Sequence, residues 1–225
     1  SPTAVAFYRS EDGGQTWDRG QLDVALTCPD VTFPRVLGLA VDPDNPEEMW
    51  MAIEVDGLRH SSDGGRTWSR PQGELPNQDI HGVLVTEGPN KKVVVLTNRQ
   101  VFTSSDNGTT WQQAARPSPF DDGYTHGFAV SPGSDVVFVG SGNVFPGNQG
   151  AIVRSANAGQ SWDEMNLDQP ANSTIWSLAA HPADPEVLLG ASRFGYVYCS
   201  DDAGASWRKL PREFGDLGST AWVPA

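Results

Sequence analysis

Two histidines, an arginine and a tryptophan stand at matching places in the sequence, each at the start of an apolar run. They are His81 and His126, both followed by glycine, together with Arg35 and Trp176. An imidazole can carry a proton near neutral pH, a guanidinium can hold an anion, and an indole offers a face for stacking. Side chains of these types, brought together, would form a polar pocket for ligand binding or acid–base chemistry.

Two carboxylates, a phenol and two more cations extend this set. Asp79 and Tyr124 adjoin the histidines in the sequence, and Glu54, Arg99 and Arg193 fall in polar segments that follow apolar runs. The candidate catalytic residues are His81, His126, Glu54, Asp79 and Tyr124. The candidate ligand-binding residues are Arg35, His81, His126, Trp176, Arg99 and Arg193.

The same residues allow a plainer interpretation, in which they line a solvated channel with satisfied hydrogen bonds. Two histidines in equivalent positions could also hold a metal ion, with Glu54 or Asp79 completing the ligand set. Because the histidines lack the short ligand spacing typical of metal sites, we predict no metal and no cofactor.

One eight-residue pattern, Ser-x-Asp-x-Gly-x-Thr/Ser-Trp, indicates how these residues are positioned. We call each copy a box; the five copies are residues 10–17, 61–68, 104–111, 155–162 and 200–207, and the fourth has Asn157 in place of the aspartate. The closing tryptophans are 43 to 51 residues apart, the length of one propeller blade. An Asp that accepts turn amides and a Gly that supplies positive φ make each box a hairpin turn, after which the tryptophan can pack inward. We expect all five tryptophans to be mostly buried.

Between the boxes the sequence repeats a four-strand pattern. In one repeat the expected strands are residues 36–41, 49–53, 58–61 and 67–69, and in the last they are 175–180, 187–190, 196–200 and 206–209. Several first and second strands are apolar on both faces, as strands sandwiched between neighbouring sheets must be. With no convincing helical period, the sequence predicts an all-β propeller of four-stranded antiparallel blades.

The five boxes resemble the Asp boxes of sialidase-like and BNR-repeat propellers, a superfamily that includes the photosystem II assembly factor and sortilin-type receptors. The resemblance covers nearly the whole chain. It implies the fold and leaves the activity open, because enzymes and binding proteins share this structural turn.

Sialidases carry an Arg-Ile-Pro motif, three carboxylate-binding arginines and a Tyr–Glu pair, and the segment Phe33-Pro34-Arg35-Val36 does not match that motif. A typical sialidase is therefore not expected. A glycosidase that uses two carboxylates could draw on Glu54, Asp56 and Asp79.

The two ends of the chain are expected to share a blade. Residues 5–17 supply only the last two strands of one, and residues 220–223 resemble a first strand. The chain then forms about five blades, four complete and one shared, or it is a trimmed part of a six- or seven-bladed ring. Residues 1–225 are expected to form a single domain.

The charge balance limits which classes of partner the chain can bind. The chain has 15 Lys and Arg against 28 Asp and Glu, a formal net charge of −13. An acidic surface repels phosphate backbones, so no nucleic-acid partner is expected. No apolar run approaches the roughly 18 residues of a membrane-spanning segment, and the sequence leaves the compartment open.

These residues and repeats point to two functions. The first is a propeller that binds a small molecule, a glycan or a protein segment on the channel face opposite the boxes. The alternative is a glycosidase-like hydrolase or lyase that acts in the same pocket.

Overall fold

The computed structural model describes residues 5–27, 33–87 and 90–224, which fold as β-strands and loops. A short N-terminal hairpin pairs β1 (Tyr8–Arg9) with β2 (Asp18–Arg19). Four antiparallel sheets, the blades of a propeller ring, follow in chain order. Their strands are β3 (Val36–Val41), β4 (Met49–Ile53) and β5 (Gly57–Ser61); β6 (Ile80–Val85), β7 (Val93–Thr97), β8 (Val101–Ser104) and β9 (Gln112–Gln113); β10 (Tyr124–Val130), β11 (Val137–Gly142), β12 (Gly150–Ser155) and β13 (Asp163–Glu164); and β14 (Ile175–His181), β15 (Asp184–Ser192), β16 (Val197–Ser200) and β17 (Arg208–Lys209).

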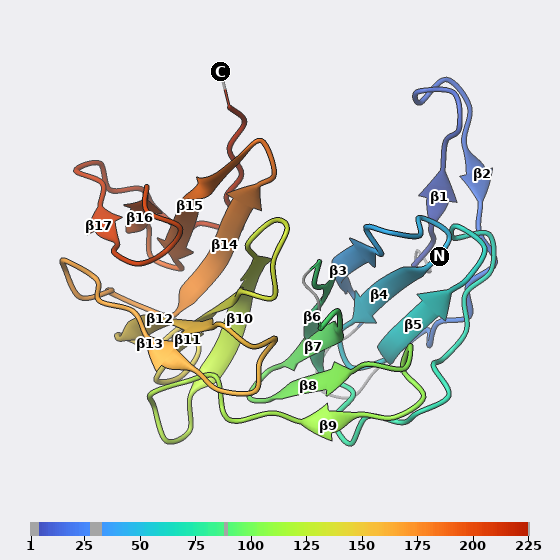
Figure 1. Cartoon of the computed structure of the whole chain (residues 1–225), viewed down its shortest axis with the longest axis horizontal. Coiled ribbons are helices and arrows are strands. Elements are labelled where there is room, and N and C mark those ends of the chain that lie inside the picture. The colour runs from blue at the N-terminus through green and yellow to red at the C-terminus, as the bar shows by residue number, and fades with distance from the viewer. Residues whose placement is uncertain (1–4, 28–32, 88–89, 225) are drawn as a thin grey trace.

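The first strand of each blade lies innermost, and β3, β6, β10 and β14 contact one another in that order (Figure 1). Glycine permits this approach, because a Cβ on Gly38 would lie 3.3 Å from the Val83 nitrogen and one on Gly127 would lie 3.2 Å from the Ser177 nitrogen. Figure 1 shows the ring open between β14 and β3. Among the described residues, no helix is long and apolar enough to cross a membrane.

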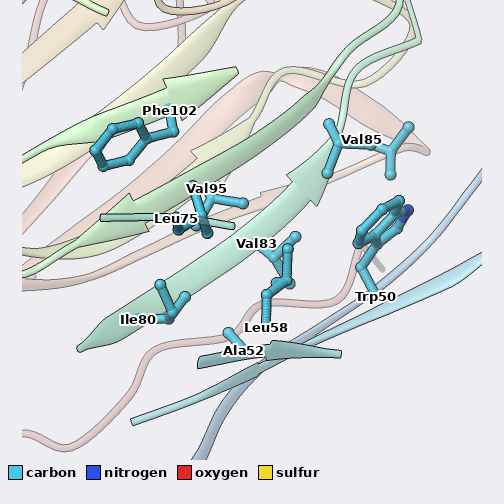
Figure 2. Close-up of a cluster of buried hydrophobic side chains, with 10 residues drawn as sticks. Trp50, Ala52, Leu58, Leu75, Ile80, Val83, Val85, Val95 and Phe102 are labelled. Carbon is cyan, nitrogen blue, oxygen red and sulfur yellow. The ribbon is translucent and has the colours of Figure 1, made fainter. Parts of the chain in front are cut away.

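The core lies between neighbouring blades. Every residue of β4, β7 and β11 is buried, as expected for second strands with a sheet on either side. Figure 2 shows one cluster, in which side chains from β4 and β5 gather against β6 and the strands next to it. Its labelled members are Trp50, Ala52, Leu58, Leu75, Ile80, Val83, Val85, Val95 and Phe102.

The five boxes form the same turn. In the second box the Ser61 hydroxyl donates to Asp63 Oδ1 over 2.8 Å, the Thr67 hydroxyl donates to Asp63 Oδ2 over 2.6 Å, and the Gly65 amide donates to the Ser61 hydroxyl. Asn157 preserves the fourth turn, since its amide nitrogen donates to Ser161 and its oxygen accepts the Ser161 amide. The repeat therefore works as a turn in every blade.

Two expectations need correction. The termini do not share a blade: β1 and β2 pair only with each other, and residues 210–224 form no strand. The tail lies beside β14 instead, where the Thr220 amide donates to the Ser177 hydroxyl over 3.0 Å. With no second strand between them, the tail and β1 have no ladder through which to join. The fourth strand of the first blade is also reduced to a single bridge between His60 and Ser69.

The box tryptophans are not uniformly buried, contrary to the expectation from the sequence. Trp68 and Trp207 are 7% and 2% exposed, and Trp111 and Trp162 are half-buried. Trp17 is 60% exposed. The expectation is therefore wrong at the first box.

Candidate functional site

A β-bulge lies near the start of each innermost strand. The pairing skips one residue between Val36 and Gly38, between Ile80 and Gly82, and between Ile175 and Ser177, and it shifts between Thr125 and Phe128. A bulge leaves one residue outside the ladder and re-aims its side chain. The residues that the four blades place there are Leu37, His81, His126 and Trp176.

Three of these side chains meet and continue into a row of rings. The centroids of His81 and His126 are 5.3 Å apart, and His126 stacks on Trp176 at 3.5 Å with 14° between the ring planes. Tyr124 lies 6.3 Å and Phe145 5.0 Å from the Trp176 ring. We call Tyr124, His126, Phe145 and Trp176 the aromatic shelf. The Arg193 guanidinium lies 5.6 Å from the Trp176 centroid and adds a cation at its edge.

Backbone carbonyls fix both imidazoles. His81 Nδ1 lies 2.7 Å from the Thr125 carbonyl oxygen, and His126 Nδ1 lies 2.9 Å from that of Trp176. Because a carbonyl only accepts hydrogen bonds, each Nδ1 carries the proton and donates it. Burial, with a contribution from His81, lowers the pKa of His126 to about 4, so this ring is neutral at pH 7.

A group of ionisable side chains adjoins the rings. Arg35 holds Glu54 through two nitrogens: its Nε bonds to Oε2 and its second contact, to Oε1, is 2.8 Å long. Three possible metal-ligand atoms, one each from Glu54, Asp79 and His81, all lie within 4.8 Å of one another. We call Arg35, Glu54, Asp79 and His81 the charged cluster. The hydrogen bonds to Glu54 raise the pKa of Arg35.

Tyr124 links the shelf to the cluster. Burial raises the pKa of its phenol well above the usual value, and the carboxylates of Asp79 and Glu54 add to the shift. The phenol is thus protonated at neutral pH. It can donate a hydrogen bond to a ligand, and it is poorly suited to act as a nucleophile.

The boxes lie at the other end of the blades. Each third strand begins at the end where the shelf and cluster lie and runs to its box, as antiparallel pairing with the second strand requires. Between the two ends the inner strands line an apolar hollow that includes Val83, Phe128, Ala129 and Leu178.

Most of the residues chosen from the sequence come together here. They are Arg35, Glu54, Asp79, His81, Tyr124, His126, Trp176 and Arg193. Arg99 does not join them: its guanidinium bonds to Asp122 over 3.3 Å, and it borders a separate hollow with Asn77 and Arg116.

The alignment of Arg35 with the histidines needs correction by two residues. The Arg35 carbonyl accepts the Glu54 amide, just as the Asp79 carbonyl accepts the Asn98 amide. Arg35 is therefore equivalent to Asp79, and Leu37 is the equivalent of His81. Arg35 still reaches the site, because it pairs with Glu54.

Phe145 is a site residue that the sequence did not single out. It lies in the loop between β11 and β12, and its side chain is 47% exposed. An aromatic residue next to Pro146 in such a loop was the available signal.

Fold and site together define a class, a β-propeller with aromatic and charged side chains gathered at one end of its inner strands. No protein-family model matches the chain. A xyloglucanase from Paenibacillus sp is 24% identical over 93% of the chain, and xyloglucanase Xgh74A from Acetivibrio thermocellus is 25% identical over 93%. The chain spans only 20% and 29% of the length of these two relatives.

Solved structures share the fold. The GH74 enzyme of Niastella koreensis superposes with a TM-score of 0.68 at 18% identity, over 91% of this chain and 34% of that one. YCF48 from Cyanidioschyzon merolae superposes with a TM-score of 0.57 at 16% identity, over 83% of this chain and 59% of that one. Both neighbours are β-propellers, and at these identities the likeness concerns the fold.

Proposed function

We propose that residues 1–225 form one propeller domain that binds a glycan on the aromatic shelf, at the end of the blades opposite the boxes. The observation that carries this proposal is the shelf itself. Phe145 and Trp176 are partly exposed, their rings are 5.0 Å apart, and polar groups adjoin them. A sugar ring offers apolar C–H faces for stacking and hydroxyls for hydrogen bonds, which is the combination that such a surface recognises.

The polar side of the site supports this proposal. The neutral His126, the protonated Tyr124 and the Arg193 guanidinium offer donors and an acceptor around the shelf. The two relatives named above are xyloglucanases, and xyloglucan is a glycan, the same class of ligand as the one proposed for the shelf. The box turns are proposed to be Asp boxes of the BNR type, and the chain a member of the sialidase-like superfamily.

A glycosidase-like hydrolase remains the second proposal, because carboxylate oxygens of Glu54 and Asp79 lie within 4.8 Å of each other. Close carboxyl groups are typical of retaining glycosidases, in which they are about 5 Å apart. Such an enzyme needs one carboxyl group that holds a proton. Arg35 binds both oxygens of Glu54 and leaves neither free to pass a proton to a leaving group, so the geometry favours binding over hydrolysis.

The test is calorimetric titration with xyloglucan oligosaccharides and cello-oligosaccharides. We expect Trp176→Ala to weaken binding at least tenfold, since it removes the centre of the shelf. Trp17→Ala is the matched control, because it deletes an exposed tryptophan at the box end and should bind as the wild type does. Equal binding by both variants, or none by the wild type, contradicts the proposal.

A reducing-end assay on the same mixtures decides between the two proposals. Release of reducing ends that disappears in Glu54→Gln would establish the hydrolase. Binding without release is the expected result.

A further inference from the structure

A ring nitrogen and a carboxylate oxygen face each other in the charged cluster. His81 Nδ1 donates its proton to the Thr125 carbonyl, so Nε2 is the ring nitrogen that is left to contact another group. That atom lies 3.3 Å from Asp79 Oδ1. Asp79 Oδ1 is itself buried and has no hydrogen-bond partner among the residues that the structure describes. A lone pair and an unpartnered carboxylate oxygen repel each other unless something positive lies between them.

The separation indicates what that positive group is. A charge-assisted N–H···O bond is about 2.7–2.9 Å long, so 3.3 Å is too long for a directed imidazolium–carboxylate bond. Zinc binds histidine nitrogen and carboxylate oxygen at about 2.0–2.2 Å, and tetrahedral geometry then places the two ligand atoms roughly 3.3–3.5 Å apart. The observed separation fits a shared metal ion.

A third ligand is in place. A Glu54 oxygen lies within 4.8 Å of a ligand atom of Asp79 and of His81, and the residue is buried. Both Glu54 oxygens are hydrogen-bonded to Arg35. The Arg35 side chain is 63% exposed and can turn into solvent. If one Glu54 oxygen bound a metal ion, the other could stay bonded to Arg35.

We propose that His81 Nε2, Asp79 and Glu54 bind one divalent transition-metal ion, with Zn²⁺ as the best match. One imidazole nitrogen with carboxylate oxygens suits Zn²⁺ or Mn²⁺ better than Ca²⁺ or Mg²⁺, which prefer oxygen alone. Three protein ligands leave a fourth position beside Tyr124 for water or a ligand group. The Thr125 carbonyl fixes the imidazole tautomer, the usual role of an outer partner of a metal-bound histidine.

The sequence indicated this site only in part, since it offered Glu54 or Asp79 as a partner of two histidines. Asp79 and His81 are two residues apart at the start of β6, whereas Glu54 follows β4 in the neighbouring blade, so only the fold brings the third ligand to the pair. The inference does not depend on a glycan being bound, because the metal is measured alone.

The experiment uses the full chain without a purification tag, after treatment with a chelator. One sample is titrated with Zn²⁺ in a calorimeter, and a second is titrated with Co²⁺ while the visible absorption of the bound ion is recorded. We expect one equivalent to bind, with a Co²⁺ spectrum of low coordination number. Asp79→Asn keeps the side-chain shape and should weaken affinity at least tenfold, and Glu54→Gln should weaken it less. Affinity should also fall as pH falls, because protons compete for Nε2.

Two further variants guard against false results. His181→Gln removes an imidazole at the last residue of β14, at the opposite end of the strand from Trp176, and should leave binding unchanged. Arg35→Ala frees Glu54 and should tighten binding severalfold. Far-ultraviolet circular dichroism and thermal unfolding confirm that each variant folds.

The proposal is overturned if no equivalent binds, if the wild type and Asp79→Asn give the same isotherm, or if His181→Gln abolishes the signal. In the first case the pair takes only a proton; in the other two the metal binds adventitious surface groups. None of these results affects the glycan titration, so the two proposals fail separately.

Discussion

The first and second boxes have the same turn and different surroundings. In both, the serine and threonine hydroxyls donate to the aspartate, and the tryptophan Nε1 donates to the fifth residue of the box, over 3.1 Å in Trp17 and 3.0 Å in Trp68. Yet Trp17 is 60% exposed and Trp68 is 7% exposed. The turn is therefore a local structure that eight residues determine, whereas burial of its tryptophan is a property of the neighbouring blade.

Aromatic side chains from the preceding part of the chain account for the difference. The Phe7 ring lies 5.1 Å from Trp68, Trp50 lies 6.2 Å from Trp111, and Phe138 lies 6.1 Å from Trp207, all edge to face. Trp17 has no such ring against it in the described part of the chain. The contact between neighbouring blades, rather than the box turn, therefore stabilises the propeller.

The largest expected effect comes from deleting a packed tryptophan. Trp68→Ala should lower the free energy of unfolding by about 3–5 kcal/mol, as a large-to-small change in a core does. Trp17→Ala should change it by no more than about 0.5 kcal/mol, as at other exposed sites. Urea unfolding of the two variants measures both values. Similar losses in the two would show that the turn itself carries the stability.

A smaller effect is expected at the fifth residue of the box. Gly204 has φ of +84°, and a Cβ there would overlap the Phe138 ring, whereas one on Gly14, with φ of +90°, meets nothing nearer than 3.7 Å. Either change to alanine costs roughly 1–2 kcal/mol for the left-handed backbone. Gly204→Ala adds about 1–3 kcal/mol of overpacking. Thermal unfolding should rank Gly204→Ala below Gly14→Ala, and the reverse order would refute the inter-blade contact.

The smallest expected effect is common to both boxes. Hydrogen bonds from Thr16, and from Thr67 in the second box, lower the pKa of Asp12 and Asp63 from 3.8 to about 2. The unfolded chain binds these protons first, so the turns add stability above about pH 4 and lose it as pH falls towards 2. Carboxyl titration by NMR should give both residues similar low values. A normal value for Asp12 alone would mean that the first turn needs a neighbouring blade.

The same division between local and distant effects explains what could be predicted from the sequence. The boxes revealed the blades, because a turn is determined by adjacent residues. His81, His126 and Trp176 were found because each opens an apolar run. Arg35 was aligned two residues away from its true register, because it directly precedes the apolar run that starts at Val36, whereas His81 follows Ile80, the first apolar residue of its run.

Other residues depended on contacts that the sequence does not reveal. The loop position of Arg99 suggested the pocket, but Asp122 holds this side chain elsewhere. The tail resembled a strand in its residue types, and it lacks a partner strand to pair with. The Asp79–His81 pair required knowledge of which nitrogen faces the carboxylate.

The bulges also make this end of the molecule open to redesign. Leu37, His81, His126 and Trp176 stand outside the hydrogen-bond ladder, one from each blade, so their side chains are freed from the alternation that the pleat imposes on the rest of each strand. Their identities can change without altering the register of any sheet. Two of these positions, His126 and Trp176, supply half of the aromatic shelf, so changes in two codons would alter recognition while every blade keeps its strand pairing.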